Sequence, residues 1–319
     1  MKPPRRLLAA LATLLVLGAL AEEAPIRILV GFPPGGGSDL IARLVAERMR
    51  TSLGTAVVVE NRPGASGAIA AEALKNASPD GRTLMVAPIG VSVFGPLTNS
   101  KLRFDPVRDF APVSLAANFQ FVWVVGPATP AKSLPEYVAW VRASPARGTY
   151  GVPIAGGPSH FFGVMLGQAI GLQLAAVPYK GGPQLVTDVI GGQVAAAVTS
   201  LADVLRQHQA GRLRAVAISG AQRSPLAPDV PTFTELGFAG LEGAGWQAFH
   251  TTAGTPRPVI DRLATAVAAA IHAPEVRQAL IAEGLDPVGS SADELARRMA
   301  EDTARWAPVV KSSGFRADQ

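Results

Sequence analysis

The sequence predicts an α/β protein of two lobes, each built on a mostly parallel β-sheet flanked by helices. Apolar runs typical of strands alternate with helical patterns along the chain, which favours parallel sheets. The 319 residues exceed what one hydrophobic core usually serves, and 48% of them are apolar, enough to fill two cores. Glycine and proline lie between the apolar runs as turn signals, and no fixed-period repeat interrupts the pattern.

The first 21 residues are expected to be a cleaved export signal. Lys2, Arg5 and Arg6 precede an apolar run over residues 7–20, and Ala19-Leu20-Ala21 forms a small-x-small cleavage site. The apolar run is shorter than the roughly 20 residues that a membrane-spanning helix needs. Removing the signal takes away three of the 29 basic residues and none of the 24 acidic ones, which leaves a net charge of +2 instead of +5.

The mature chain opens with a strand, a glycine loop and a helix. The strand covers residues 26–32, and the helix starts at Leu40, with Leu44 and Met49 on its apolar face. Three successive glycines, Gly35 to Gly37, let the backbone N–H groups approach a ligand, and the N-terminus of the following helix favours an anion. Ser38 or Asp39 could also cap that helix, which need not exclude binding by Gly35 to Gly37, and an Asp39 carboxylate facing the cleft would oppose a bound anion.

The same alternation continues through the rest of the chain. Turn signals separate the predicted strands at residues 57–60, 83–87, 150–152, 174–177, 195–198 and 213–218, and helices are expected at residues 66–76, from Phe161 and at residues 184–190. Two more glycine loops precede helices, at residues 155–160 and 178–183. Ligands of parallel sheets bind beyond the carboxyl ends of the strands, where these loops lie.

Composition argues against several classes of function. The basic residues are scattered, without a run or a basic-aromatic stripe, so no nucleic acid partner is expected. The absence of cysteine excludes disulfides, thiolate metal sites and a cysteine nucleophile. His208, His250 and His272 lack metal-ligand spacing, so we expect no metal and no cofactor.

Motifs of catalysis are also missing from the sequence. Ser66 does not lie in a glycine-x-serine-x-glycine elbow, and the first glycine loop lacks both the dinucleotide fingerprint and the P-loop lysine. We therefore expect no catalytic residues and no enzyme activity. An exported enzyme acting on a small anionic substrate stays as the alternative, together with a ligand-sensing protein that feeds a signalling system.

Five segments in order resemble the Bug family, the periplasmic substrate-binding subunits of tripartite tricarboxylate transporters. The resemblance covers essentially the whole mature chain and rests on residues 31–39 (GFPPGGGSD), 59–64 (VENRPG), 79–81 (PDG), 104–110 (FDPVRDF) and 177–182 (VPYKGG). It implies a Venus-flytrap of the type II periplasmic-binding-protein kind. Such a protein closes on a small carboxylate, without a dedicated arginine, and delivers it to the permease subunits in the inner membrane.

The resemblance also suggests domain limits, location and a site. Lobe 1 would comprise residues 22–124 and 222–319, lobe 2 residues 125–221, and the monomeric protein would be periplasmic after cleavage near Ala21. The expected ligand-binding residues come from the glycine loops and from the end of one strand: Phe32, Pro34, Gly35, Gly36, Gly37, Ser38, Asp39, Ala87, Gly156, Gly157, Ser159, His160, Tyr179, Gly181 and Gly182.

Some of these residues also fit ordinary structural roles. Tyr179 could be a core aromatic residue, Lys180 a solvated charge, and His160 either a helix cap or a ligand contact. Ile89 and Ile154 could form an apolar rim around an apolar ligand body, or belong to the core. The identity of the carboxylate stays open at this point.

Overall fold

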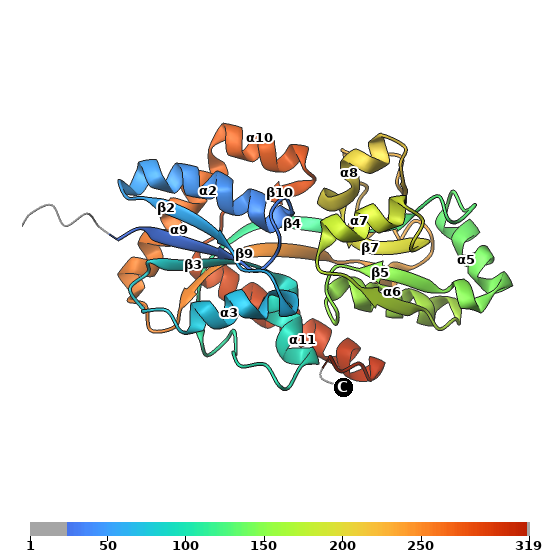
Figure 1. The fold of residues 1–319 in the computed structure, drawn as a ribbon, viewed down its shortest axis with the longest axis horizontal. Helices are drawn as coiled ribbons and strands as arrows, with labels where there is room; N and C mark the ends of the chain where they lie inside the picture. Colours follow the sequence, from blue (N-terminus) through green and yellow to red (C-terminus); the bar gives the residue numbers. More distant parts are fainter. Residues whose placement is uncertain (1–23, 318–319) are drawn as a thin grey trace, which may run out of the picture.

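The computed structural model describes residues 24–317, and within them the chain forms two lobes side by side (Figure 1). The predicted signal peptide and its cleavage site near Ala21 lie outside the described residues. None of the helices between residues 24 and 317 is long and apolar enough to cross a membrane.

The first lobe contains a sheet in which three parallel strands lie beside an antiparallel pair. Its strand order is β2–β1–β3–β9–β4, and the short β10 pairs with the free side of β4. The strands are β1 (Ile26–Val30), β2 (Val57–Asn61), β3 (Thr83–Pro88), β4 (Phe110–Val125), β9 (Ala244–Thr252) and β10 (Leu285–Pro287).

Helices cover both faces of this sheet. On one face, α2 (Gly37–Leu53), α9 (Arg257–His272) and α10 (Pro274–Ala282) contact one another. In Figure 1, α3 (Ala68–Lys75) and α11 (Ala292–Ser313) lie on the opposite side from α2 and α10. A short helical turn at Gly90–Phe94 and α4 (Gly95–Thr98) follow β3 and contact α11.

The second lobe contains a smaller sheet of the order β6–β5–β7–β4–β8, parallel from β6 to β7 and antiparallel around β4. Its elements are α5 (Leu134–Ala143), β5 (Thr149–Val152), α6 (Pro158–Ile170), β6 (Ala175–Pro178), α7 (Gly182–Ile190), β7 (Ala196–Ser200), α8 (Leu201–Gln209) and β8 (Arg214–Ile218). The two-lobed α/β fold predicted from the sequence is therefore confirmed.

One long strand joins the two sheets. Up to Gln120, β4 pairs with β9 and β10, and from Phe121 onward it pairs with β7 and β8. The chain returns to the first sheet after β8, where the Ser219 backbone N–H donates to the carbonyl of Phe121 (2.8 Å) and the Gly243 N–H donates to the carbonyl of Ser219 (2.9 Å). These two adjacent connections place the floor of any cleft between the lobes along β4.

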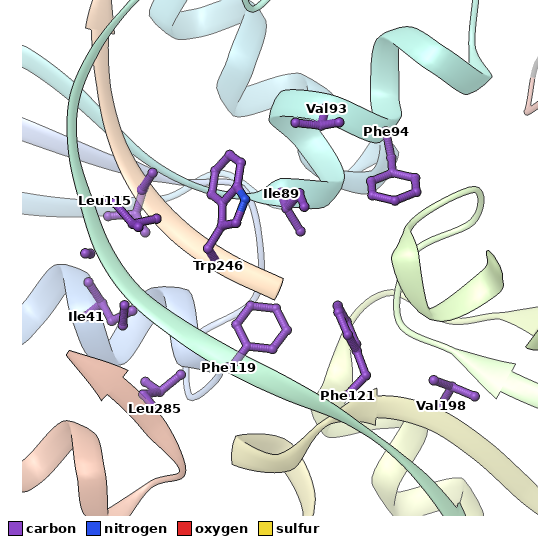
Figure 2. Packing of buried hydrophobic residues seen from close by; sticks show 14 of the residues in the cluster. Ile41, Ile89, Val93, Phe94, Leu115, Phe119, Phe121, Val198, Trp246 and Leu285 are labelled. Carbon is purple, nitrogen blue, oxygen red and sulfur yellow. The ribbon is translucent and has the colours of Figure 1, made fainter. Parts of the chain in front are cut away.

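The hydrophobic core continues from one lobe toward the other along β4. Figure 2 shows the rings of Phe119 and Phe121 on the same side of this strand, between Trp246 of the first lobe and Val198 of the second. Trp246 is fully buried, and its indole N–H donates to Asp302 of α11 at 2.7 Å. Burial of side chains of this size contributes roughly 1.5–3 kcal/mol each.

Candidate binding site between the two lobes

A cleft opens between the lobes above β4, with about 790 Å³ of empty space that includes solvent at its mouth. The segments that follow β1, β3, β5 and β6 line it, together with the end of β7 and the start of α8, Gln247 of β9 and Leu285 of β10. Eight of the predicted site residues line this cleft: Phe32, Gly36, Gly37, Ser38, Asp39, Ser159, Gly181 and Gly182. The fold thus brings the first and third glycine loops to one cavity.

The first glycine loop ends as the N-terminus of α2 and presents free backbone donors. Gly36 precedes the helix, whose first turn has no side-chain cap. Among residues 24–317, no hydrogen-bond acceptor pairs with the backbone N–H groups of Gly36, Gly37 or Ser38. The orphan N–H groups of a helix start form a ready site for an anion.

Ser38 and Asp39 do not cap α2, contrary to one of the two sequence interpretations. The hydroxyl of Ser38 donates to Gln247 Oε1 at 2.9 Å, which ties the helix start to β9. The Asp39 carboxylate accepts hydrogen bonds from the Gly35 N–H (3.1 Å), from Arg43 Nε (2.9 Å) and from Asn61 Nδ2 (2.9 Å). These contacts hold the glycine loop in place.

The charge of Asp39 is compensated within the first lobe. Burial by itself would raise the pKa of Asp39, but the hydrogen bonds from Arg43, Asn61 and Gly35 outweigh it and hold the pKa below the usual range. Arg43 in turn donates to Asn61 Oδ1 at 3.2 Å. Asp39 is therefore ionised at neutral pH and paired with a cation, so it opposes a bound anion only weakly.

The second lobe contributes Ser159 at the start of α6 and the pair Gly181-Gly182 at the start of α7. Gly181 has φ +120°, a conformation that strongly favours glycine. The position of Gly182 must lack a side chain for another reason: a Cβ there would lie 2.4 Å from Cγ of Asp203. The Asp203 carboxylate thus packs against the backbone at the N-terminus of α7.

Asp203 and Gln247 line the cleft and were not among the predicted site residues. Asp203 is the third residue of α8 and follows a capping serine, Ser200, a pattern that indicates a structural capping residue. Its carboxylate Oδ2 accepts from the hydroxyls of Thr199 (2.6 Å) and Ser200 (2.8 Å). Burial raises the pKa of Asp203, against the hydrogen bonds from Thr199 and Ser200 that lower it.

Apolar side chains fill the rest of the cleft wall. Ile89 and Ile154, the two residues of the expected apolar rim, both line the cleft, as do Phe119, Phe121 and Leu285. Ile89 is also buried in the core, so the two roles proposed for it are compatible. A Cβ on Gly90 would lie 3.0 Å from Ile154 Cδ1, so the lobes touch at this point.

The other predicted residues do not line the cleft. Pro34 and Gly35 belong to the first loop outside the cleft wall, Ala87 is buried within β3, and Gly157 precedes α6. A Cβ on Gly156 would lie 2.7 Å from the ring of Phe315, which follows α11, so this glycine lies on another contact between the lobes.

His160 and Tyr179 also point elsewhere. His160 Nδ1 accepts from the Gly156 N–H at 3.2 Å, and its ring packs edge-on against Phe315 at 4.2 Å between centroids. Burial lowers the pKa of His160, so it is uncharged at neutral pH. Tyr179 packs against the apolar core of the second lobe, and Lys180 is exposed.

Between residues 24 and 317, no group of three or more histidine, aspartate and glutamate side chains is arranged to hold a metal ion. The cleft itself contains two acidic side chains, Asp39 and Asp203, and no lysine, arginine or histidine lines it. Backbone N–H groups are therefore its main donors toward an anion.

Comparison with known proteins agrees with this geometry. Residues 41–315 match the family model described as "Tripartite tricarboxylate transporter family receptor". Protein BugT of Bordetella pertussis is 33% identical over 294 residues, which cover 91% of this chain and 89% of that protein.

Two solved structures with bound carboxylates have the same fold. Rpa4515 of R. palustris with adipate aligns with a TM-score of 0.87 and 30% identity, over 92% of this chain and 98% of that one. MatC of Rhodopseudomonas palustris with bound malate aligns with a TM-score of 0.84 and 28% identity, over 90% and 98% of the two chains.

Proposed function

Because the chain belongs to the tripartite tricarboxylate transporter receptor family, we propose that it is a periplasmic solute receptor for a small carboxylate. The lobes close on this solute, and the receptor delivers it to the permease subunits of a transporter in the inner membrane. The expected cleavage near Ala21 would release the mature protein into the periplasm as a monomer.

The observation that carries this proposal is the row of free N–H groups at Gly36, Gly37 and Ser38, facing a cleft between two lobes. A hydrogen bond to an ionised carboxylate contributes roughly 1.5–3 kcal/mol, and a helix N-terminus adds about 0.3–2 kcal/mol. Four or five such contacts, less several kcal/mol for association, reach the roughly 8 kcal/mol of a micromolar receptor.

The bound solutes of two relatives support the ligand class. Adipate and malate are both small dicarboxylates. The enzyme alternative has less support, because Asp39 is tied up by Gly35, Arg43 and Asn61 and neither Asp39 nor Asp203 faces a histidine or a basic side chain across the cleft.

The test is calorimetric titration of the mature protein with a panel of carboxylates, including adipate and L-malate. We expect micromolar binding of at least one member, unaffected by exhaustive chelation, with the ligand recovered unchanged. Absence of binding across the panel, loss of affinity with EDTA, or conversion of the ligand would contradict the receptor proposal. Uptake of the identified ligand by cells that lack this protein tests delivery, and unchanged uptake would contradict it.

A further inference from the structure

The charged side chains that line the cleft limit which charged groups a ligand can carry. Only two ionisable side chains line it, and Asp39 is paired with Arg43 on the side of the first lobe. Asp203, from the second lobe, has no lysine or arginine within ion-pair distance among residues 24–317. Arg206, one turn further along α8, pairs with Glu283 instead. The cleft thus contains one carboxyl group, that of Asp203, which no basic side chain among residues 24–317 pairs with.

Only one of the two carboxylate oxygens of Asp203 accepts hydrogen bonds within the protein. Thr199 and Ser200 both donate to Oδ2, and no donor among the described residues reaches Oδ1. The two hydroxyl donors favour the ionised form, but burial has the larger effect and raises the pKa of Asp203, so a cation beside Oδ1 would stabilise the charged carboxylate. Asp203 lines the cleft, so its second oxygen is the acceptor that the second lobe has available for a ligand.

Asp203 also changes what the third glycine loop can bind. Its Cγ would lie 2.4 Å from a Cβ on Gly182, so the carboxylate rests against the start of α7, where an external anion would otherwise be attracted. A ligand carboxylate placed there would meet the carboxyl group of Asp203, which is a like charge whenever Asp203 is ionised. The two ends of the cleft are therefore unequal: free N–H donors lie at α2, and a carboxyl group without a basic partner lies at α8.

We propose that the ligand is a carboxylate with a protonated amine at its far end. This inference rests on the proposed receptor function and specifies its ligand. The carboxylate of the ligand binds the N–H groups of Gly36 to Ser38, and its ammonium group donates to Asp203 across the cleft. An apolar body packs against Ile89, Phe119 and Ile154 between the two ends. Because such a zwitterion is neutral overall, it matches a cleft that has no basic side chain.

Matched ligand pairs test this inference on the unmodified mature protein. 4-Aminobutanoate and glutarate share three methylene groups, and 5-aminopentanoate and adipate share four, so each pair differs only in an ammonium or a carboxylate at one end. We expect the amine of at least one pair to bind at least tenfold more tightly than its dicarboxylate, since a charge-assisted hydrogen bond replaces a like-charge contact.

The variant Asp203→Asn removes the charge and keeps an oxygen that can accept from Thr199 and Ser200. It should lose at least tenfold in affinity for the amine and should lose the preference within the pair. The matched control is Asp261→Asn, which removes an exposed carboxylate paired with Arg257 on α9 and should leave both affinities unchanged. Thermal unfolding of both variants checks that they are folded.

Tighter binding of the dicarboxylates by the unmodified protein would overturn this inference and leave the carboxylate receptor proposal intact. The same holds if Asp203→Asn is folded and keeps the preference for the amine. If no member of either pair binds, this inference is overturned as well, and the wider carboxylate titration then decides whether the receptor proposal also falls.

Discussion

At the scale of single residues, the backbone at Gly36 determines whether the cleft can bind an anion. Gly36 has φ −91°, which other residues adopt readily, and a Cβ there would meet no atom within 4 Å. Its glycine is therefore not required by the fold. What a side chain would change is access to the N–H groups of the first turn of α2, which is the feature on which the receptor proposal rests.

The substitution Gly36→Val should weaken carboxylate binding by at least tenfold and change the free energy of unfolding by less than about 1 kcal/mol, since the site has neither strain nor a clash. Calorimetry and thermal unfolding measure the two effects. Gly240→Val is the control, because a Cβ at Gly240 also meets nothing within 4 Å, and Gly240 does not line the cleft. Wild-type affinity in Gly36→Val would contradict recognition by this backbone.

His250 links stability to pH. It lies fully buried in β9, and neither ring nitrogen has a side-chain hydrogen-bond partner among the described residues. Burial lowers its pKa to about 4, whereas the unfolded chain has the usual pKa of about 6.5. Between these values the unfolded state binds a proton that the folded state does not, so stability is full above pH 6.5 and is lost as the pH falls toward 4.

We expect the free energy of unfolding that His250 alone contributes to fall by about 3 kcal/mol as the pH is lowered to 4. The variant His250→Leu should show a smaller loss of unfolding free energy between pH 7 and pH 4, measured by urea denaturation at each pH. All other titrating groups, Asp203 included, are common to both proteins and cancel in the difference. Parallel pH profiles for the two proteins would show that His250 is not the group responsible.

At the scale of elements, the glycine loops place helix starts at the cleft. The sequence predicted helices from Leu40, Phe161 and Gln184, and the structure begins them at Gly37, Pro158 and Gly182. The first turn of each helix thus includes a residue that the sequence analysis assigned to a loop, Gly37, Pro158 or Gly182. This extra turn brings the N–H groups of α2 to the cleft, beside the start of α7.

Two elements from different lobes also meet near the cleft, where Arg206 of α8 forms an ion pair with Glu283, which follows α10. Both residues line a second opening that shares Gly36, Gly37 and Asp203 with the cleft. Because this pair joins the lobes, it should stabilise the closed form. An exposed ion pair is worth about 0–1 kcal/mol.

The substitution Glu283→Gln should therefore reduce ligand affinity by no more than about fivefold, and the difference from wild type should shrink at high salt because exposed charges are screened. Titration at two ionic strengths measures this effect. Glu275→Gln, which removes an exposed carboxylate that pairs with Arg48 within the first lobe, is the control and should bind like wild type. Equal affinities for wild type and Glu283→Gln at low salt would contradict a role in closure.

At the scale of the whole molecule, two connections at one place allow the lobes to move as units. β4 and the segment after β8 cross side by side, tied by the hydrogen bonds between Phe121 and Ser219. A ligand that contacts Gly36 on one lobe and Ser159 or Asp203 on the other favours the closed arrangement by its differential affinity for that form.

We expect small-angle scattering to show a smaller radius of gyration when saturating ligand is added. The folded but weakly binding variant Gly36→Val should show no such change at the same ligand concentration. Identical scattering of the free and ligand-saturated wild-type protein would contradict closure on binding.

The sequence by itself determined the fold class, because strand and helix patterns alternate along it. The spacing of apolar residues that marks each strand or helix is a local property of the chain. The sequence also predicted that Gly36, Gly37 and Ser38 present backbone N–H groups to a ligand, since a glycine run between a strand and a helix positions N–H groups whatever lies around it, and these three residues line the cleft. The assignments of Gly156, His160 and Tyr179 rested on the same local reasoning, but the structure places these residues outside the cleft wall. Neighbours from distant segments decide on which side of a loop a residue lies.

Only the tertiary structure decided which charges the cleft contains. Along the chain, Asp203 is indistinguishable from an ordinary capping residue of α8, and Gln247 is one polar residue in an apolar strand. Packing of α8 against the start of α7 brings the Asp203 carboxylate to Gly182, 21 positions earlier in the chain, and pairing of β9 with β4 and β3 brings Gln247 to Ser38. The chemistry at each end of the site depends on contacts between segments far apart in sequence, and no local pattern specifies these contacts.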